Sequence, residues 1–387
     1  MTWSSPASDD DRAAARSGEL QVTEPAEQPL WRPSPERATR TQMVTFARRA
    51  ESASGGQLQC VREDGTLDYE ALWRWSVDRR QDFWPEVWRF CDVIADTARR
   101  GSADAPWGQV VVGLDRMAPP DATLGPRWFA GATLNFAENL LRYADDREAL
   151  VAWNEEGRYR SLSYAALSQQ VARVAAALRR EGVGVGDRVA AFLPNVPEAV
   201  IGMLATASLG AIWSSCSPDF GVRGVLDRFG QIAPKLLIAA DGYIYAGKRI
   251  DCLARVREIV AALPGIKRVV VVPYLRGGLG HAGASLDAGD TDNERELPSG
   301  AKWWGDWLHA DSGPLSFVRL PFEHPLCILY SSGTTGLPKC MVHGAGGTLL
   351  QHLKEHRLHT DIRRDDRIFY FTTCGWMMWN WLVSALA

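Results

Sequence analysis

One stretch of the sequence gathers the residue types that hold a phosphate group. It reads SSGTTGLPK and follows an apolar run at 326–330. Its hydroxyls donate hydrogen bonds, its glycines let backbone N–H groups approach an anion, and its lysine brings a mobile positive charge. The apolar run is typical of a buried strand that delivers a loop at its carboxyl end. We expect this loop to bind the triphosphate of ATP through Ser331, Ser332, Gly333, Thr334, Thr335, Gly336 and Lys339.

The same residue types also form plain solvated turns, and this interpretation stays open for the loop taken alone. The loop is not a Walker A motif, because that motif needs glycine, lysine and serine or threonine in direct succession. Here Lys339 stands three residues after Gly336, and Cys340 follows it. A different kind of phosphate loop is therefore predicted.

A second stretch, 242–248, fits the first part of a Walker A motif. Arg249 stands where that motif needs a serine or threonine for magnesium, so a Walker loop is not expected here. Two interpretations of Lys248 and Arg249 remain. Either they meet a phosphate group, or they begin a solvated helix.

A third pattern, His352-x-x-Glu355-His356, matches a zinc-peptidase signature in which two histidines bind zinc and the glutamate acts as base. The neighbouring Lys354 and Arg357 favour an ordinary charged helix face instead. Zinc peptidase activity is kept as a remote alternative, and no residue is assigned to a metal.

Composition places the chain among ordinary globular proteins. Its 387 residues exceed what one hydrophobic core usually supports, so at least two domains are expected. The formal net charge of -3 gives no reason to expect a nucleic acid or an anionic membrane as partner. The seven cysteines are scattered singly, which favours reduced, buried thiols. The chain shows no leader pattern and no apolar run of roughly 18 residues, and we predict a cytoplasmic protein.

The pattern along the chain predicts three regions. Residues 1–40 read as a disordered polar arm, and 41–143 as a helical, tryptophan-rich region with Asp82 as a possible helix cap. Region 144–387 alternates strands and helices, which predicts an α/β domain built from βαβ units. Its expected strands are 189–193, 211–215, 235–239, 269–272 and 367–372, and its expected helices are 163–181, 197–208, 222–232, 251–263 and 347–359.

The end of the chain is unusually apolar. The run 379–387 has a helical pattern and stops without a capping glycine or a polar tail. Exposed carbonyls and apolar side chains at a terminus lack partners, so we expect the chain to be an amino-terminal fragment of a longer protein.

Several runs carry a resemblance to a known family. The run 330–339 resembles the signature loop of the adenylate-forming superfamily of acyl-CoA synthetases, luciferases and adenylation domains. With its continuation to 347, it is similar to the acetoacetate-CoA ligase branch. The further matching runs are 135–141, 193–195, 214–221 and 372–381. The resemblance implies an α/β, acyl-CoA synthetase-like large domain over 144–387, truncated, after a helical amino-terminal region.

The resemblance also implies a reaction. A carboxylate attacks the α-phosphate of ATP to give an acyl-adenylate and pyrophosphate, and the coenzyme A thiol then displaces AMP. A carboxylate is already anionic at neutral pH, so positioning and charge neutralisation suffice in the first step. The implied small molecules are acetoacetate, ATP, Mg²⁺ and coenzyme A, without a prosthetic group.

Roles follow for individual residues from the same resemblance. The loop would hold the β and γ phosphates, and Lys248 and Arg249 would meet the phosphorylated nucleotide end of coenzyme A. Trp376 and Trp379 would wall the acyl pocket, although plain core residues would look the same. The adenylation lysine and the adenine, ribose and magnesium motifs would lie beyond Ala387, so the chain alone is not expected to complete the ligation. The alternatives are a synthetase for another short-chain acid and a non-catalytic nucleotide- or phosphate-binding protein.

Overall fold

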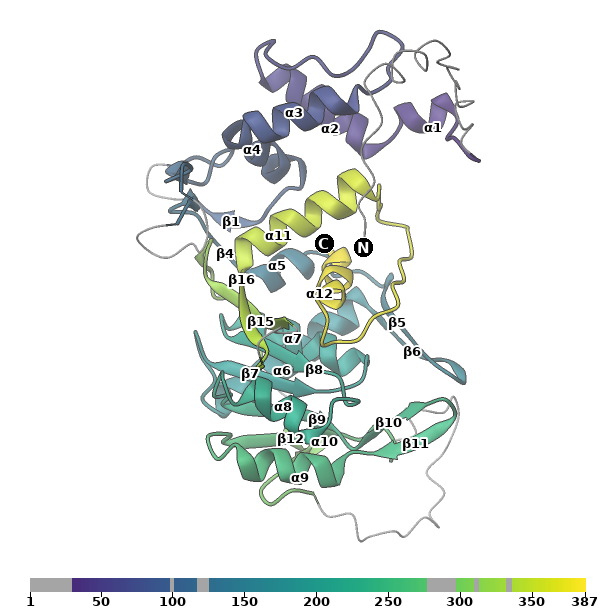
Figure 1. Cartoon of the computed structure of the whole chain (residues 1–387), viewed down its shortest axis with the longest axis vertical. Helices are drawn as coiled ribbons and strands as arrows, with labels where there is room; N and C mark the ends of the chain where they lie inside the picture. The colour runs from purple at the N-terminus through teal and green to yellow at the C-terminus, as the bar shows by residue number, and fades with distance from the viewer. Residues whose placement is uncertain (1–29, 98–100, 117–124, 277–296, 310–312, 332–335) are drawn as a thin grey trace, which may run out of the picture.

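A parallel sheet forms the centre of the molecule (Figure 1). The structure, a computed structural model, describes residues 30–97, 101–116, 125–276, 297–309, 313–331 and 336–387. Within them the sheet has seven strands in the order β13-β12-β9-β7-β8-β15-β16. Neighbouring strands are parallel except β15 and β16, which are antiparallel. Their bounds are β7 Arg188–Phe192, β8 Ile212–Cys216, β9 Leu236–Ala240, β12 Arg268–Val272, β13 Lys302–Trp303, β15 Pro325–Ser331 and β16 Lys339–Gly344.

Helices cover both faces of this sheet, because its inner strands are apolar on both sides. Successive side chains of a strand point to opposite faces. In β7, Val189 and Ala191 join the core that includes α6 and α7, while Ala190 and Phe192 join the core that includes α8 and α9. This arrangement confirms the predicted α/β class. The helices are α6 Tyr164–Arg180, α7 Pro197–Ser208, α8 Val222–Phe229 and α9 Leu253–Ala262.

The predicted strands and helices of this part agree with the structure to within a few residues, apart from 367–372. Helix α7 has the predicted bounds. Helix α6 begins after Ser163, whose Oγ accepts a hydrogen bond from the N–H of Ala166 at 3.2 Å, as expected for a cap. All seven cysteines are free, and each except Cys340 is buried.

The segment 367–372 is not a strand, so that prediction is wrong. No strand of the described residues pairs with it, and Phe369 and Phe371 are 82% and 90% exposed. A strand needs a neighbouring backbone for its hydrogen bonds, which sequence alternation alone does not supply. The stretch 276–300 is rich in Gly, Asp and Ser, which predicts an exposed insertion loop, and it lies largely outside the described residues.

The amino-terminal region consists of helices and short strands. Its elements are α1 Pro35–Thr39, α2 Gln42–Ala53, α3 Tyr69–Asp78, α4 Arg80–Phe90, β1 Ala95–Asp96, β2 Gln109–Val112, β3 Arg127–Ala130, β4 Thr133–Leu134 and α5 Phe136–Leu140. Two predictions need correction. The expected arm is helical at α1, and its residues 1–29 lie outside the description. Asp82 does not cap α4, which begins at Arg80; instead its carboxylate accepts a hydrogen bond from the Nε of Arg79 at 2.8 Å.

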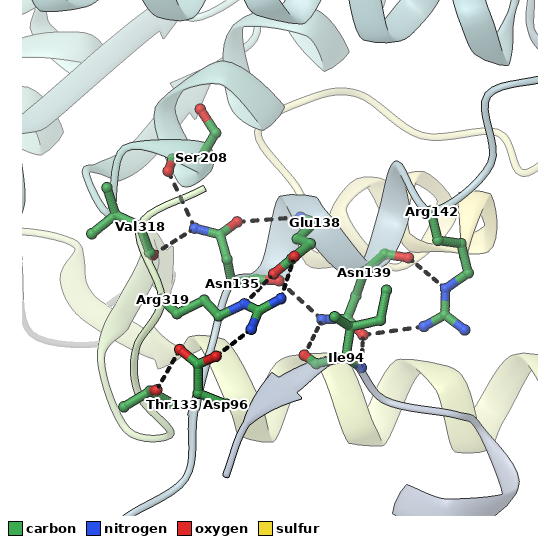
Figure 2. A network of polar contacts seen from close by, with 10 residues as sticks. All are labelled: Ile94, Asp96, Thr133, Asn135, Glu138, Asn139, Arg142, Ser208, Val318 and Arg319. Atoms are coloured by element: carbon green, nitrogen blue, oxygen red, sulfur yellow. Dashed lines mark hydrogen bonds and ion pairs between the residues drawn. The ribbon is translucent and has the colours of Figure 1, made fainter. Parts of the chain in front are cut away.

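Helix α5 joins the two regions (Figure 2). Asn135 caps it by accepting a hydrogen bond from the N–H of Glu138 at 3.2 Å. The Nδ2 of Asn135 donates to the carbonyls of Ala207, at the end of α7, and of Val318, at 2.9 and 2.8 Å. Arg319 then meets the carboxylate of Glu138 with two bonds of 2.7 and 2.6 Å. The run 135–141, singled out in the sequence, is therefore a joint between the regions.

The remaining elements surround the sheet. Figure 1 shows α11 between the amino-terminal helices and the sheet. The bounds are β5 Glu148–Asn154, β6 Gly157–Ser163, β10 Gly242–Tyr245, β11 Lys248–Asp251, α10 Trp304–Trp307, β14 Leu320–Pro321, α11 Ala345–Lys354, a π-helical turn Glu355–His359, α12 Met377–Val383 and a 3-10 turn Ser384–Leu386. Among the described residues, no helix combines the length and apolar character needed to cross a bilayer.

Candidate active site at the carboxyl edge of the sheet

The strand order reverses at the carboxyl edge of the sheet, next to β7. From β7 the chain crosses to β8 on one side, and it then continues to β9 on the other side of β7. Ligands of open α/β sheets bind at the carboxyl ends of strands where the order reverses in this way. The exits of β7 and β8 and the loop after β15 share this edge, since these strands are parallel.

The predicted phosphate loop is the turn of a hairpin. Strands β15 and β16 flank it, with Ser331 directly opposite Lys339. The hydroxyl and the exposed ammonium group therefore stand at the same end of the hairpin. Gly336 has a φ of 123°, a conformation that favours glycine. Ser332, Gly333, Thr334 and Thr335 lie outside the described residues.

The stem of this hairpin is tied to the neighbouring strand. Ser214 of β8 donates a hydrogen bond from its Oγ to the carbonyl of Ile328 at 3.0 Å. Its Oγ also lies 3.0 Å from the hydroxyl of Tyr330, which acts as the donor because the serine proton is already used. Burial raises the pKa of Tyr330 above its usual value, so this hydroxyl keeps its proton.

The segment 372–376 lies over the exits of β7 and β8. Ser215 donates a hydrogen bond from its Oγ to the carbonyl of Cys374. The fully buried thiol of Cys374 donates to the carbonyl of Leu193 at 2.8 Å. A Cβ added to Gly375 would lie 3.4 Å from the backbone nitrogen of Ser217. Burial raises the pKa of the Cys374 thiol, so it packs and donates rather than acting as a thiolate.

The two tryptophans predicted for the acyl pocket have different surroundings. Trp376 precedes α12 and is 63% exposed. Trp379 is 1% exposed, and its Nε1 donates to the Oδ1 of Asn195, at the exit of β7, at 2.9 Å. Trp379 thus packs in the core, which was one of its two open interpretations. Trp376 is the one that reaches the surface, at the end of the segment that lies over the exits of β7 and β8.

Lys248 and Arg249 lie in a hairpin of their own, formed by β10 and β11. Its turn has left-handed residues at Ala246 and Gly247, with φ of 49° and 71°. The carboxylate of Glu155 accepts hydrogen bonds from both of their N–H groups, at 2.7 and 2.6 Å. Because 242–248 pairs as a strand and turn, it is not a Walker loop.

This hairpin does not adjoin the phosphate loop. It follows β9, which is three strands from β15 in the sheet. At about 4.8 Å per strand, that separation is about 14 Å. Lys248 and Arg249 are exposed, and Arg249 donates a hydrogen bond to the carbonyl of Leu275. A phosphate that met these two residues would therefore lie apart from the predicted phosphate loop.

The histidines of the zinc pattern point into the protein. His352 Nδ1 lies 2.7 Å from the Oγ of Ser384, and His356 donates from Nε2 to the carbonyl of Trp381 at 2.9 Å. Burial lowers their pKa values to about 3 and about 4, so both rings are neutral near pH 7. Glu355 instead pairs with Lys354 at 2.9 Å. The rings support the packing of α12, and the geometry opposes the zinc peptidase alternative.

Some parts of the site carry little sequence signal. Strand β16 is largely exposed, with a weak apolar pattern, so it is not predicted as the partner of β15. The contact between Ser214 and Tyr330 joins residues that are 116 positions apart. The only signal for Ser214 was its place in the matching run 214–221.

Comparisons with known proteins give one consistent result. The model of a family described as AMP-binding enzyme matches residues 136–386. An acetoacetyl-coenzyme A synthetase of Rhizobium meliloti is 48% identical over 363 residues, which cover 94% of this chain and 50% of that protein. A malonamoyl-CoA synthetase of Penicillium aethiopicum is 39% identical over 377 residues, covering 93% of this chain and 47% of its own length.

A solved structure agrees with these relatives. The acetoacetyl-CoA synthetase of Streptomyces lividans matches with a TM-score of 0.78 and 40% identity, covering 93% of this chain and 50% of that one. The chain spans about half the length of the relatives that it matches. The family match covers well over half of the chain and includes β7, β8, β15 and β16. The chain therefore belongs to the family of AMP-binding enzymes.

Proposed function

We propose that this chain supplies the phosphate-binding part of an ATP-dependent acid–thiol ligase that joins acetoacetate to coenzyme A. The observation that carries the proposal is the hairpin of β15 and β16, which presents Ser331 and Lys339 together at the carboxyl edge of a parallel sheet. The choice of acid is supported by relatives named acetoacetyl-CoA synthetase, at 48% and 40% identity.

The proposed reaction has two steps. An oxygen of the acetoacetate carboxylate attacks the α-phosphorus of ATP, which enters as its magnesium complex. The bond to the bridging oxygen breaks, and pyrophosphate leaves with the electron pair. The sulfur of coenzyme A then attacks the acyl carbon, AMP leaves with the electron pair of the acyl–oxygen bond, and the thiol proton passes to solvent. No proton must be removed from the acid in the first step.

The residues take separate parts in this reaction. Lys339, Ser331 and the loop between them bind the β and γ phosphates, where the leaving pyrophosphate gains negative charge. The bond between Tyr330 and Ser214 holds the stem of the loop against β8. Trp376, exposed beside the strand exits, walls the acyl group. Lys248 and Arg249 receive the phosphorylated nucleotide end of coenzyme A at their separate hairpin.

The test is exchange of labelled pyrophosphate into ATP, measured with the full-length product of the gene. We expect exchange that depends on acetoacetate, followed by acetoacetyl-CoA formation when coenzyme A is added. Malonamate is the competing acid, because one relative is named malonamoyl-CoA synthetase. Faster exchange with malonamate would replace the acid. ATP binding without exchange for any short-chain acid would leave a non-catalytic nucleotide binder and overturn the ligase.

A further inference from the structure

Arg228, in the last turn of α8, lies between two aromatic rings. Its guanidinium carbon is 4.4 Å from the ring centre of Phe220 and 5.7 Å from that of Tyr330. Its Nη1 donates to the carbonyl of Gly224 at 2.7 Å, and the side chain is half-buried. Among the described residues, no carboxylate forms an ion pair with it.

The two rings belong to different segments at the carboxyl edge of the sheet. Tyr330 directly precedes Ser331 and the phosphate loop. Phe220 follows the exit of β8, and a Cβ added to Gly375 would lie 3.6 Å from its ring. Phe220 therefore supports the segment 372–376, which leads to Trp376. Arg228 therefore contacts a support of the phosphate loop, Tyr330, and a support of the proposed acyl wall, Phe220.

The chemistry of arginine suits this position. A planar guanidinium stacks on aromatic faces, which an ammonium group does less well. The positive charge is not neutralised by a carboxylate of the described residues, so it also favours an anion at the neighbouring loop.

We propose that Arg228 is a positioning residue for the adenylation step. Resting on the function proposed above, the inference is that Arg228 fixes the stem of the phosphate loop relative to the acyl wall. The carboxylate and the α-phosphorus then meet at the correct distance. Misplacement of reacting groups by about 1 Å can cost on the order of 100-fold in rate. The charge of Arg228 aids ATP binding, and its stacked plane aligns the two substrates.

Two variants separate the contribution of the charge of Arg228 from that of its stacked plane. Arg228→Met removes both charge and plane, whereas Arg228→Lys keeps the charge alone. We expect kcat for acid-dependent exchange to fall about 10- to 100-fold in both. The KM for ATP should rise several-fold in R228M and return to near the wild-type value in R228K. Arg223→Met is the matched control, since Arg223 is exposed on the same helix.

The experiment measures exchange kcat, KM for ATP and the thermal unfolding midpoint in the full-length product. Equal kcat values for R228M and R223M would overturn the inference. A normal kcat in R228K would do so too, and R228K decides alone if R228M does not fold. A fall in kcat that follows only the folded fraction would show a purely structural role. Wild-type protein without exchange for any acid would instead reject the proposed function.

Discussion

Lys339 begins the exposed strand β16, opposite Ser331, and residues of the loop between them lie outside the described part. A charge-assisted contact to phosphate contributes about 1.5 to 3 kcal/mol, and its loss weakens binding about 10- to 100-fold. We expect Lys339→Met to raise the KM for ATP by that factor in pyrophosphate exchange. Lys302→Met is the control, because Lys302 lies at the opposite edge of the sheet. Similar KM values for both variants would contradict the assignment.

Asn135 supports a second prediction at this scale. Its Oδ1 caps α5, and its Nδ2 serves buried carbonyls that include those of Ala207 and Val318. Asn135→Ala leaves these groups unpaired, so we expect a loss of about 2 to 4 kcal/mol in the free energy of unfolding. Asn135→Asp keeps the cap but sets a carboxylate against carbonyls. It should be no more stable than N135A in denaturant unfolding. A stable N135D would show that only the cap matters.

Sequence patterns predict which residue types occur at such sites better than they predict where the side chains point. Trp376 and Trp379 are three positions apart on one apolar run, yet one is at the surface and the other is in the core. His352 and His356 match a zinc pattern, but their rings bond to the segment 381–384. Side-chain direction depends on which distant element packs against the helix, and this information is not local.

At the scale of elements, local sequence patterns predict a strand correctly where both of its faces are buried, and a helix where one stripe of it is buried. Strand β9 and helix α7 carry unbroken apolar runs or clear end signals, and their predictions are confirmed. The exposed strand β16 and the unpaired segment 367–372 were the failures. In both, what decides the structure is whether a neighbouring backbone is present, and apolar alternation does not report that.

The two buried histidines where α11 and its π-helical turn pack against α12 should make the free energy of unfolding depend on pH. Unfolded histidines titrate near pH 6.5, whereas burial lowers the pKa of His352 to about 3 and of His356 to about 4. Between the folded and unfolded pKa values, the unfolded state binds more protons than the folded state. The free energy of unfolding therefore rises with pH in this range, and the protein loses stability on acidification. At pH 5 each histidine should lower the free energy of unfolding by about 2 kcal/mol relative to pH 7.

The measurement is denaturant unfolding at pH 7 and pH 5. His356→Gln keeps a donor at the position of the ring Nε2 for the carbonyl of Trp381 but does not titrate, so its loss of stability on acidification should be about 2 kcal/mol smaller than that of the wild type. The exposed His309 provides the control, and His309→Gln should behave like the wild type. If H356Q keeps the full pH dependence, buried His356 is not its source.

The whole molecule combines regions that the sequence pattern separates. The sequence pattern predicts a boundary near 143, yet β4 of the helical region pairs with both β1 and β14 in one three-stranded sheet. Residues 135–141 connect the same two regions through α5 (Figure 2). A change in pattern marks where periodicity changes, whereas cooperative units follow contacts that are distant in sequence. We therefore expect the described parts of both regions to unfold together.

The ion pair between Arg319 and Glu138 offers a test of whether the two regions are coupled through α5. Arg319 contacts Glu138 of α5 with two bonds, and the side chains are 27% and 17% exposed. A bidentate, largely buried pair should show a coupling energy of about 1 to 3 kcal/mol in a double-mutant cycle of Arg319→Met and Glu138→Gln. The control pair is Arg74 with Glu70, which lies on the surface of α3 and is 67% and 66% exposed. Exposed helix pairs contribute about 0.3 to 0.5 kcal/mol, so R74M with E70Q should couple weakly. Equal coupling energies in the two cycles would contradict this prediction. Unfolding of the helical region before the sheet in wild-type protein would also contradict it, because the two regions would then not unfold cooperatively.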